Sequence, residues 1–241
     1  MKKIVPFALA ALAACASAPA PATGPAPAPG GGTTPAQGNA PAAQDAATIA
    51  AGLQRATLPS APRQANFTWA LDESGARFNG RGVARFRAPD RFRLDLFGPR
   101  GETYLAAALV DETPRVPAAL EQRFRLPSPA LLWGALGVVR PPSAARLLDA
   151  STSNGVTTVR YDRGGEGTLE YRARGGVLQG VRRLRGGGVQ ESIDLEHTGS
   201  TLRSARYREW NALRTLNLSL ESTNDVASFP EDIWSPPGAS R

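Results

Sequence analysis

Residues 90–112 read DRFRLDLFGPRGETYLAAALVDE, two apolar-alternating runs separated by the sequence GPRG. The alternating apolar positions are Phe92, Leu94, Leu96, Leu105, Ala107 and Leu109. An alternation of period two predicts strands with one apolar face, and a Gly-Pro pair followed by glycine predicts a tight reversal. The stretch therefore predicts an antiparallel hairpin with Pro99 and Arg100 at its tip. That tip is either a simple chain reversal or a device presented at the end of the hairpin.

The flanking segments follow the same period of two. Upstream, QANFTWALDE places Phe67, Trp69 and Leu71 on one face, and ARFNGRGVARFRAP follows with Asn79-Gly80 as a turn signal. Downstream of Val156, apolar residues recur along strand-like segments separated by glycine-rich turns. These residues are Val159/Tyr161, Leu169/Tyr171, Val177/Val181, Ile193/Leu195 and Leu216/Leu218/Leu220. We therefore expect about ten strands in an antiparallel meander, sandwich or barrel, with two or three helices.

Two segments have helical features instead. Residues 45–59 carry apolar residues at helical spacing and predict one amphipathic helix. A second, short helix is predicted after Pro129, with Ser128 as its cap and Pro141 beyond its end. Its apolar residues are Leu131, Leu132, Trp133, Leu136 and Val139. They can either fill the core as a plug or form a lid over a cavity.

The N-terminus has the features of an exported lipoprotein. Residues 1–14 contain two lysines and a short apolar run, too short to span a bilayer and typical of a signal peptide. The sequence Leu12-Ala13-Ala14-Cys15 resembles a bacterial lipobox, so we expect Cys15 to carry the lipid. The alternative is an ordinary signal peptide with a chance cysteine. Because alanine rather than aspartate follows Cys15, the sorting rule of proteobacterial lipoproteins implies the outer membrane.

The remaining boundaries follow from composition. Residues 15–44 are rich in Ala, Pro and Gly and predict an extended tether. Residues 45–236 predict one β domain, which is long enough for a real core, and residues 237–241 form a tail. Cys15 is the only cysteine, so an intramolecular disulfide cannot form.

The charge does not indicate nucleic-acid binding. The chain has 28 Lys+Arg against 21 Asp+Glu, and both lysines would leave with the signal peptide. The arginines alternate with apolar residues along the predicted strands, so we expect them on the solvent face of the sheet. Their runs lack the aromatic platforms that single-stranded nucleic acids stack on.

Catalytic and metal-binding patterns are weak. His197 is the only histidine, and a zinc site would need further His or Cys ligands. No nucleophile-elbow sequence accompanies it. The carboxylate pairs, such as Asp111-Glu112, fall in predicted turns and indicate solvated loops. We therefore expect neither an enzyme, nor a metal site, nor a cofactor.

The order of these elements resembles the LolA/LolB-like lipoprotein carriers. The likeness is carried by residues 66–112, in which the strand Arg81–Phe86 leads to PDRFRLDLFGPRG, comparable to a strand that ends in a GPLG-type turn in LolB-like chains. The Phe229-Pro230 pair is similar in kind. The resemblance implies a mainly β fold, an antiparallel sheet curled into an incomplete barrel and closed by helices over an apolar cavity.

The resemblance also implies which residues meet the cargo. The cavity would be lined by Trp69, Phe86, Phe92, Leu94 and Leu96 of the sheet and by Leu131, Leu132, Trp133 and Leu136 of the helical segment. Which strand parity faces inward stays open, because a one-residue shift exchanges the faces. In LolB-like proteins the residue between proline and glycine of the turn is apolar and helps to deliver acyl chains into the membrane. Here it is Arg100, whose guanidinium would not enter hydrocarbon, although its stem could snorkel.

Two functions remain open from the sequence. In the first, an outer-membrane lipoprotein binds acyl chains or lipoproteins in an apolar cavity and receives them from a periplasmic carrier protein. In the second, the same fold has a filled interior and serves as a structural or interaction accessory of an envelope assembly or transport machine. In both, the membrane is a partner through Cys15.

Overall fold

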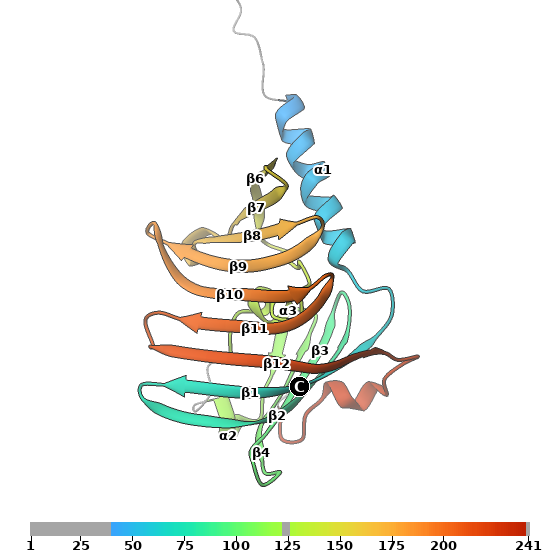
Figure 1. Ribbon diagram of the computed structural model, residues 1–241, viewed down its shortest axis with the longest axis vertical. Helices are drawn as coiled ribbons and strands as arrows, with labels where there is room; N and C mark the ends of the chain where they lie inside the picture. Colours follow the sequence, from blue (N-terminus) through green and yellow to red (C-terminus); the bar gives the residue numbers. More distant parts are fainter. Residues whose placement is uncertain (1–39, 122–125, 240–241) are drawn as a thin grey trace, which may run out of the picture. The chain divides into compact units, whose positions relative to one another are not determined.

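The computed structural model describes residues 40–121 and 126–239 (Figure 1). The helical elements are α1 (Ala40–Thr57), α2 (Ala118–Glu121), α3 (Pro129–Gly134) and the 3-10 turns η1 (Gly164–Glu166) and η2 (Glu231–Trp234). The strands are β1 (Arg63–Glu73), β2 (Ala76–Arg87), β3 (Arg91–Phe97), β4 (Thr103–Val110), β5 (Thr113–Arg115), β6 (Arg146–Ser153), β7 (Val156–Asp162), β8 (Thr168–Arg174), β9 (Val177–Arg185), β10 (Gly188–Thr198), β11 (Thr201–Glu209) and β12 (Arg214–Asp225).

All of these strands belong to one antiparallel sheet. Its order is β5-β4-β3-β2-β1-β12-β11-β10-β9-β8-β7-β6, so β1 pairs with β12 at the middle of the sheet. The edges β5 and β6 do not pair with each other within the described residues, and the curled sheet is an incomplete barrel. The predicted mainly β fold is confirmed, with twelve strands rather than about ten.

One face of the sheet is apolar because alternate residues point to it. In β1, Ala65, Phe67 and Trp69 are buried, whereas Asn66 and Thr68 between them are partly exposed. Of the pair Val177/Val181 in β9, only Val181 is buried. A β-bulge between Arg172 and Ala173 of β8 shifts the register, so that Leu178 enters the core in place of Val177.

The predicted turn at Asn79-Gly80 is also wrong. Strand β2 runs through both residues, and the β1–β2 turn lies at Ser74-Gly75. Gly80 serves a close approach instead, since a Cβ atom there would lie 1.8 Å from the carbonyl oxygen of Phe97. A glycine read as a turn signal is here a strand residue that lets the neighbouring strand come near.

Helices α1 and α3 pack against the sheet. Helix α1 begins at Ala40 rather than Asp45 and ends at Thr57; it packs against β6 and β7, and the amide of Gln54 donates to the hydroxyl of Tyr161 at 2.8 Å. Helix α3 begins at Pro129, as expected, and lies behind β10 and β11 in Figure 1. Ser128 occupies the cap position, but its hydroxyl makes no capping hydrogen bond. The packing of its buried side chains, and not a side-chain cap, therefore holds α3 in place.

The C-terminal segment covers part of the outer face. Trp234 of η2 is buried, its ring packs against Phe229, and the guanidinium of Arg87 lies over it at 5.9 Å. Arg93 of β3 donates to the carbonyl oxygen of Ile233 at 2.6 Å. The arginines of this region are therefore only partly on a solvent face, since some of them hold the C-terminal segment on the sheet.

Candidate functional site

An apolar cavity of about 100 Å³ lies between the concave face of the sheet and the segment around α3. The sheet contributes Phe67, Trp69, Leu71, Glu73, Ala84, Phe92, Leu94, Leu96, Tyr104, Leu105, Ile193, Ala205, Tyr207, Arg214, Leu216 and Leu218. The α3 segment contributes Leu126, Pro127, Leu131, Leu132, Ala135 and Leu136. Such a lining offers non-directional contact and suits an apolar ligand or ligand segment.

Most of the predicted cavity residues are brought together here. Trp69, Phe92, Leu94, Leu96, Leu131, Leu132 and Leu136 line this cavity, whereas Phe86 and Trp133 do not. Trp133 is fully buried, with its ring edge-on to Phe86 and Phe92 at 6.2 and 5.7 Å. Trp133 therefore packs α3 against the sheet, while Leu131, Leu132 and Leu136 face the cavity.

Aromatic side chains lead from the surface into the cavity. Phe78 is 40% exposed, and its ring centroid lies 5.7 Å from that of Tyr104. The ring centroid of Tyr104 lies 5.0 Å from that of Trp69. The indole N–H of Trp69 donates to the carbonyl oxygens of Arg81 and Phe97 at 3.0 and 3.2 Å. The indole N–H of Trp69 is therefore hydrogen-bonded, which orients the ring, and the apolar surface of the ring faces the cavity.

One end of the cavity carries a buried polar cluster that the sequence analysis missed. The hydroxyl of Tyr207 donates to Glu191 at 2.7 Å, and the guanidinium of Arg183 pairs with the same carboxylate at 2.5 Å. Burial, followed by the hydrogen bond to Glu191, raises the pKa of Tyr207 well above its ordinary value. Tyr207 therefore stays a protonated donor.

Arg214 extends this cluster to the cavity opening. It pairs with Glu73 of β1 and, at 3.3 Å, with Glu209 of β11. Burial opposes the charge of Arg214, but the two carboxylates outweigh it and raise its pKa. The sequence does not settle which alternate residues of each strand face inward. The contact between Glu73 and Arg214 could therefore not be predicted from it.

A second cavity of about 670 Å³ lies at the opposite strand ends. Its lining is Ala56, Thr57, Arg63, Ala65, Phe86, Leu136, Gly137, Val138, Gly176, Val177, Leu178, His197, Ser200, Thr201, Leu202, Leu220, Thr223, Asn224 and Asp225. Leu136 lines both cavities and is the residue that their linings have in common. The second cavity could not be predicted from the sequence, because its walls come from elements far apart in the chain.

His197 lies at this second cavity in strand β10. It is half-buried rather than a free surface residue, and its Nδ1 atom is buried without a hydrogen-bond partner among the described residues. Burial lowers its pKa below the ordinary value. The described residues contain no group of three His, Cys, Asp or Glu side chains placed to hold a metal ion.

The predicted hairpin tip is a tight turn. The N–H of Gly98 donates to the carbonyl of Glu102 at 2.8 Å, and the N–H of Arg100 donates to the Glu102 carboxylate at 2.9 Å. Gly101 has a φ of +83°, which favours glycine. Pro99 and Arg100 are exposed. The predicted lipid site, Cys15, lies outside the described residues, among which no helix is both long and apolar enough to cross a membrane.

An open, curled antiparallel sheet closed by a short helical segment over an apolar cavity defines the LolA-like fold. The chain resembles a LolA superfamily protein from Nitrosomonas europaea, with a TM-score of 0.53 and 9% identity over 79% of this chain and 97% of that one. It also resembles a domain described as an outer membrane lipoprotein-sorting protein from Vibrio parahaemolyticus, with a TM-score of 0.52 and 12% identity over 79% and 97%.

A third similar structure is a DUF1329 family protein from Desulfovibrio piger, with a TM-score of 0.51 and 5% identity over 83% of this chain and 99% of that one. No family model matches the chain, and no curated protein matches its sequence. The predicted LolA/LolB-like resemblance is therefore confirmed as a distant likeness, and at these identities it concerns the fold.

Proposed function

We propose that this protein is a non-enzymatic lipoprotein of the outer membrane that binds the acyl chains of lipids or lipoproteins inside its curled sheet. The apolar cavity under α3 carries the proposal, because its lining is aliphatic and aromatic apart from a polar cluster at one end. Acyl burial needs no covalent chemistry and is reversible, as a carrier requires. The anchor would be the lipid on Cys15, and the donor of the cargo a periplasmic carrier protein.

The apolar cavity is too small to hold a whole acyl chain. About 100 Å³ corresponds to only a few water-sized volumes, so a chain of about 14 methylenes needs more room. Leu132 and Leu136 of the α3 segment are only half-buried, whereas Trp133 anchors it. Leu136 is common to the linings of this cavity and of the larger one, so its displacement is the proposed route by which the chain gains room. In this proposal the carrier has a closed form, and Leu136 moves aside when an acyl chain enters.

The energetics suit transfer rather than storage. Burying about 14 methylenes at about 0.8 kcal/mol each gives a gross gain near 11 kcal/mol. A bilayer offers the acyl chain nearly the same gain. Exchange between cavity and membrane is therefore close to neutral, and small changes in the α3 segment would set its direction.

Native mass spectrometry of the chain with Cys15→Ser tests the proposal. The protein is incubated with a triacylated lipopeptide or with phospholipid vesicles and then measured for bound acyl species. Leu136→Trp, which enlarges the side chain that both cavity linings share, should abolish binding. Leu148→Trp is the matched control, because Leu148 is 45% exposed and lines neither cavity.

The second candidate is an accessory lipoprotein with a filled interior, and the small volume of the first cavity favours it. In that case α3 is a permanent plug. An unliganded mass in every sample, unchanged by any lipid, would support this function and contradict acyl binding. Binding that survives in Leu136→Trp would instead place the acyl chain elsewhere in the fold.

A further inference from the structure

The β11–β12 turn, Trp210–Leu213, presents apolar side chains from a fixed backbone. Trp210 is 52% and Leu213 76% exposed. The N–H of Trp210 donates to the carbonyl of Gln190 at 3.0 Å, and the amide of Asn211 donates to the side-chain oxygen of Gln190 at 2.6 Å. The carbonyl of Leu213 accepts from Ser74 at 3.4 Å. The turn is therefore tied to β10 on one side and to the β1–β2 turn on the other, and it holds its apolar side chains in the solvent.

Leu213 adopts an unfavourable backbone conformation. Its φ is +48°, in the left-handed region that glycine and asparagine occupy readily and leucine does not. A single exposed leucine on a surface needs no explanation. A leucine that is exposed, next to an exposed tryptophan and held in strained backbone serves neither core packing nor turn formation, and such positions indicate function.

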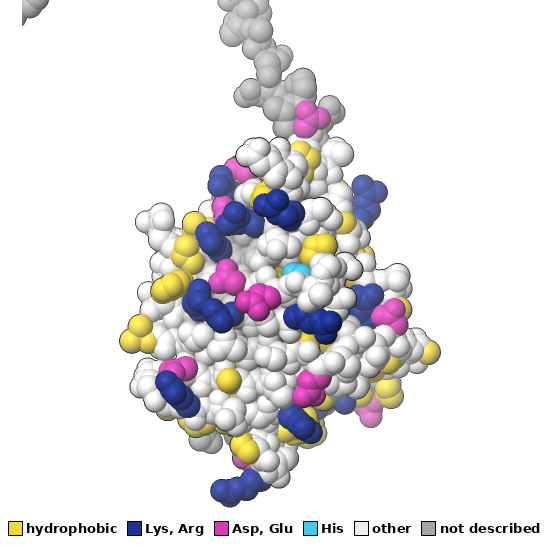
Figure 2. Space-filling model, in the orientation of Figure 1, with side chains coloured by type: hydrophobic (Ala, Val, Ile, Leu, Met, Phe, Trp, Pro, Cys, Tyr) yellow, Lys and Arg dark blue, Asp and Glu magenta, His cyan; other side chains and the backbone are white. Residues whose placement is uncertain are grey.

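The turn lies beside the opening of the acyl cavity. Arg214, the next residue, lines that cavity and pairs with Glu73 across the sheet. Phe78, also exposed, begins the aromatic path that leads through Tyr104 to Trp69. Figure 2 shows hydrophobic side chains in yellow along the left margin, where Figure 1 places the β9–β10 and β11–β12 turns. Three exposed apolar side chains thus lie at the strand ends where Glu73 and Arg214 line the cavity.

We propose that the Trp210–Leu213 turn docks on a lipid membrane and sets the cavity opening against it. Tryptophan favours the boundary between headgroups and hydrocarbon, and leucine favours the hydrocarbon beneath it. Arg100 lies in the β3–β4 turn, at the same strand ends, where its guanidinium can meet lipid phosphates. The membrane contact therefore belongs to a different turn from the one that carries it in LolB-like chains. This assignment rests on the proposed acyl carrier, but its test does not.

Tryptophan fluorescence tests the assignment directly. Of the four tryptophans, Trp69, Trp133 and Trp234 are 3% or less exposed, and only Trp210 is open to solvent. Adding phospholipid vesicles to the Cys15→Ser chain should shift the emission to the blue and protect it from iodide. Trp210→Phe should remove both responses, which assigns them to this residue. Leu213→Gly should lower vesicle partitioning about tenfold and, by relieving the backbone, leave the protein at least as stable.

The controls separate this inference from the proposed function. Leu148→Gly removes an equally large exposed side chain away from the turn and should leave partitioning unchanged. No response to vesicles overturns the docking role, even if mass spectrometry shows bound acyl chains. A blue shift that grows with protein concentration without lipid assigns the turn to a second copy and also overturns it. If the chain responds to vesicles but binds no acyl species, the docking role is supported and only the carrier proposal is contradicted.

Discussion

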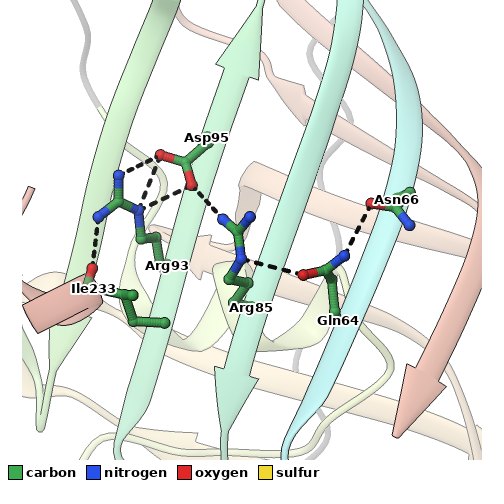
Figure 3. A network of polar contacts seen from close by, with 6 residues as sticks. All are labelled: Gln64, Asn66, Arg85, Arg93, Asp95 and Ile233. Carbon is green, nitrogen blue, oxygen red and sulfur yellow. Dashed lines mark hydrogen bonds and ion pairs between the residues drawn. The ribbon is translucent and has the colours of Figure 1, made fainter. Parts of the chain in front are cut away.

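Removal of the Asp95 carboxylate should cost this protein far more stability than removal of an exposed one. Asp95 is 5% exposed on the outer face of β3 and accepts from Arg93 at 2.8 to 3.0 Å and from Arg85 at 2.8 Å (Figure 3). Arg85 also donates to Gln64, and Arg93 donates to the carbonyl of Ile233. Asp95→Ala leaves two neighbouring guanidinium groups without their shared counter-ion.

The magnitude follows from the burial of the three groups. Loss of one partner of a buried pair costs about 3 to 5 kcal/mol. The side chains of Arg85 and Arg93 keep 30% and 15% of their exposure, so water screens part of the remaining charge. We expect Asp95→Ala to cost about 2 to 3 kcal/mol. Asp225→Ala breaks a pair with Arg63 of 2.6 Å whose side chains are 55% and 37% exposed, and should cost less than about 1 kcal/mol.

Urea unfolding of the two variants compares these costs. With a slope near 2 kcal/mol per molar, Asp95→Ala should lower the midpoint by about 1 M, and Asp225→Ala by less than half of that. Equal midpoints for the two variants would refute the reasoning, because burial is the feature that separates them. A changed slope for Asp95→Ala would show that the native state had loosened as well.

Three further predictions concern the cavities and one turn. Leu136→Ala shortens the side chain that both cavity linings share and should raise acyl occupancy in native mass spectra while lowering stability by about 1 to 2 kcal/mol; lower occupancy would contradict the proposed route past Leu136. Burial lowers the pKa of His197 below 6.5, so the unfolded chain binds its proton more readily, and stability should fall as the pH drops through that window. Melting curves of wild type and His197→Gln between about pH 7.5 and pH 5.5 should differ in slope, and parallel curves would exclude the effect. Gly167 has a φ of +93° and a Cβ there would lie 2.0 Å from the carbonyl of Leu184, so Gly167→Ala should cost about 2 to 4 kcal/mol in thermal unfolding; Gly165→Ala, with open space, should be nearly neutral, and similar melting temperatures would contradict the steric argument.

The fold could be predicted from the sequence because apolar residues alternate regularly along the strands that line the cavity. Residues 90–112 form the predicted β3–β4 hairpin, and Leu94, Leu96 and Leu105 face inward. Strand β6 escaped notice since only Leu147 and Ala150 of its eight residues pack toward the core. An edge strand with so little apolar alternation looks like a loop.

The site was harder to predict because it depends on register and on contacts between distant segments. Trp133 was assigned to the cavity with its helical neighbours, but a six-residue helix turns it away from Leu132 and toward Phe86. The charged cluster of Glu73 and Arg214 joins residues 141 positions apart. Neither helical periodicity nor residue type reveals such pairs, which arise only when β1 closes on β12.

The pairing of β1 with β12 has a consequence for the order in which the chain folds. Strands β1 to β5 and β6 to β12 are two runs of consecutive hairpins, each able to form from local contacts. The two runs meet only where the first strand hydrogen-bonds to the last, from Arg63–Asp225 to Glu73–Arg214. Contacts of such long sequence separation form slowly. The seam that places Glu73 and Trp69 opposite Arg214 and Leu218 therefore needs both the first and the last strand, and we expect the folding chain to acquire its cavity last.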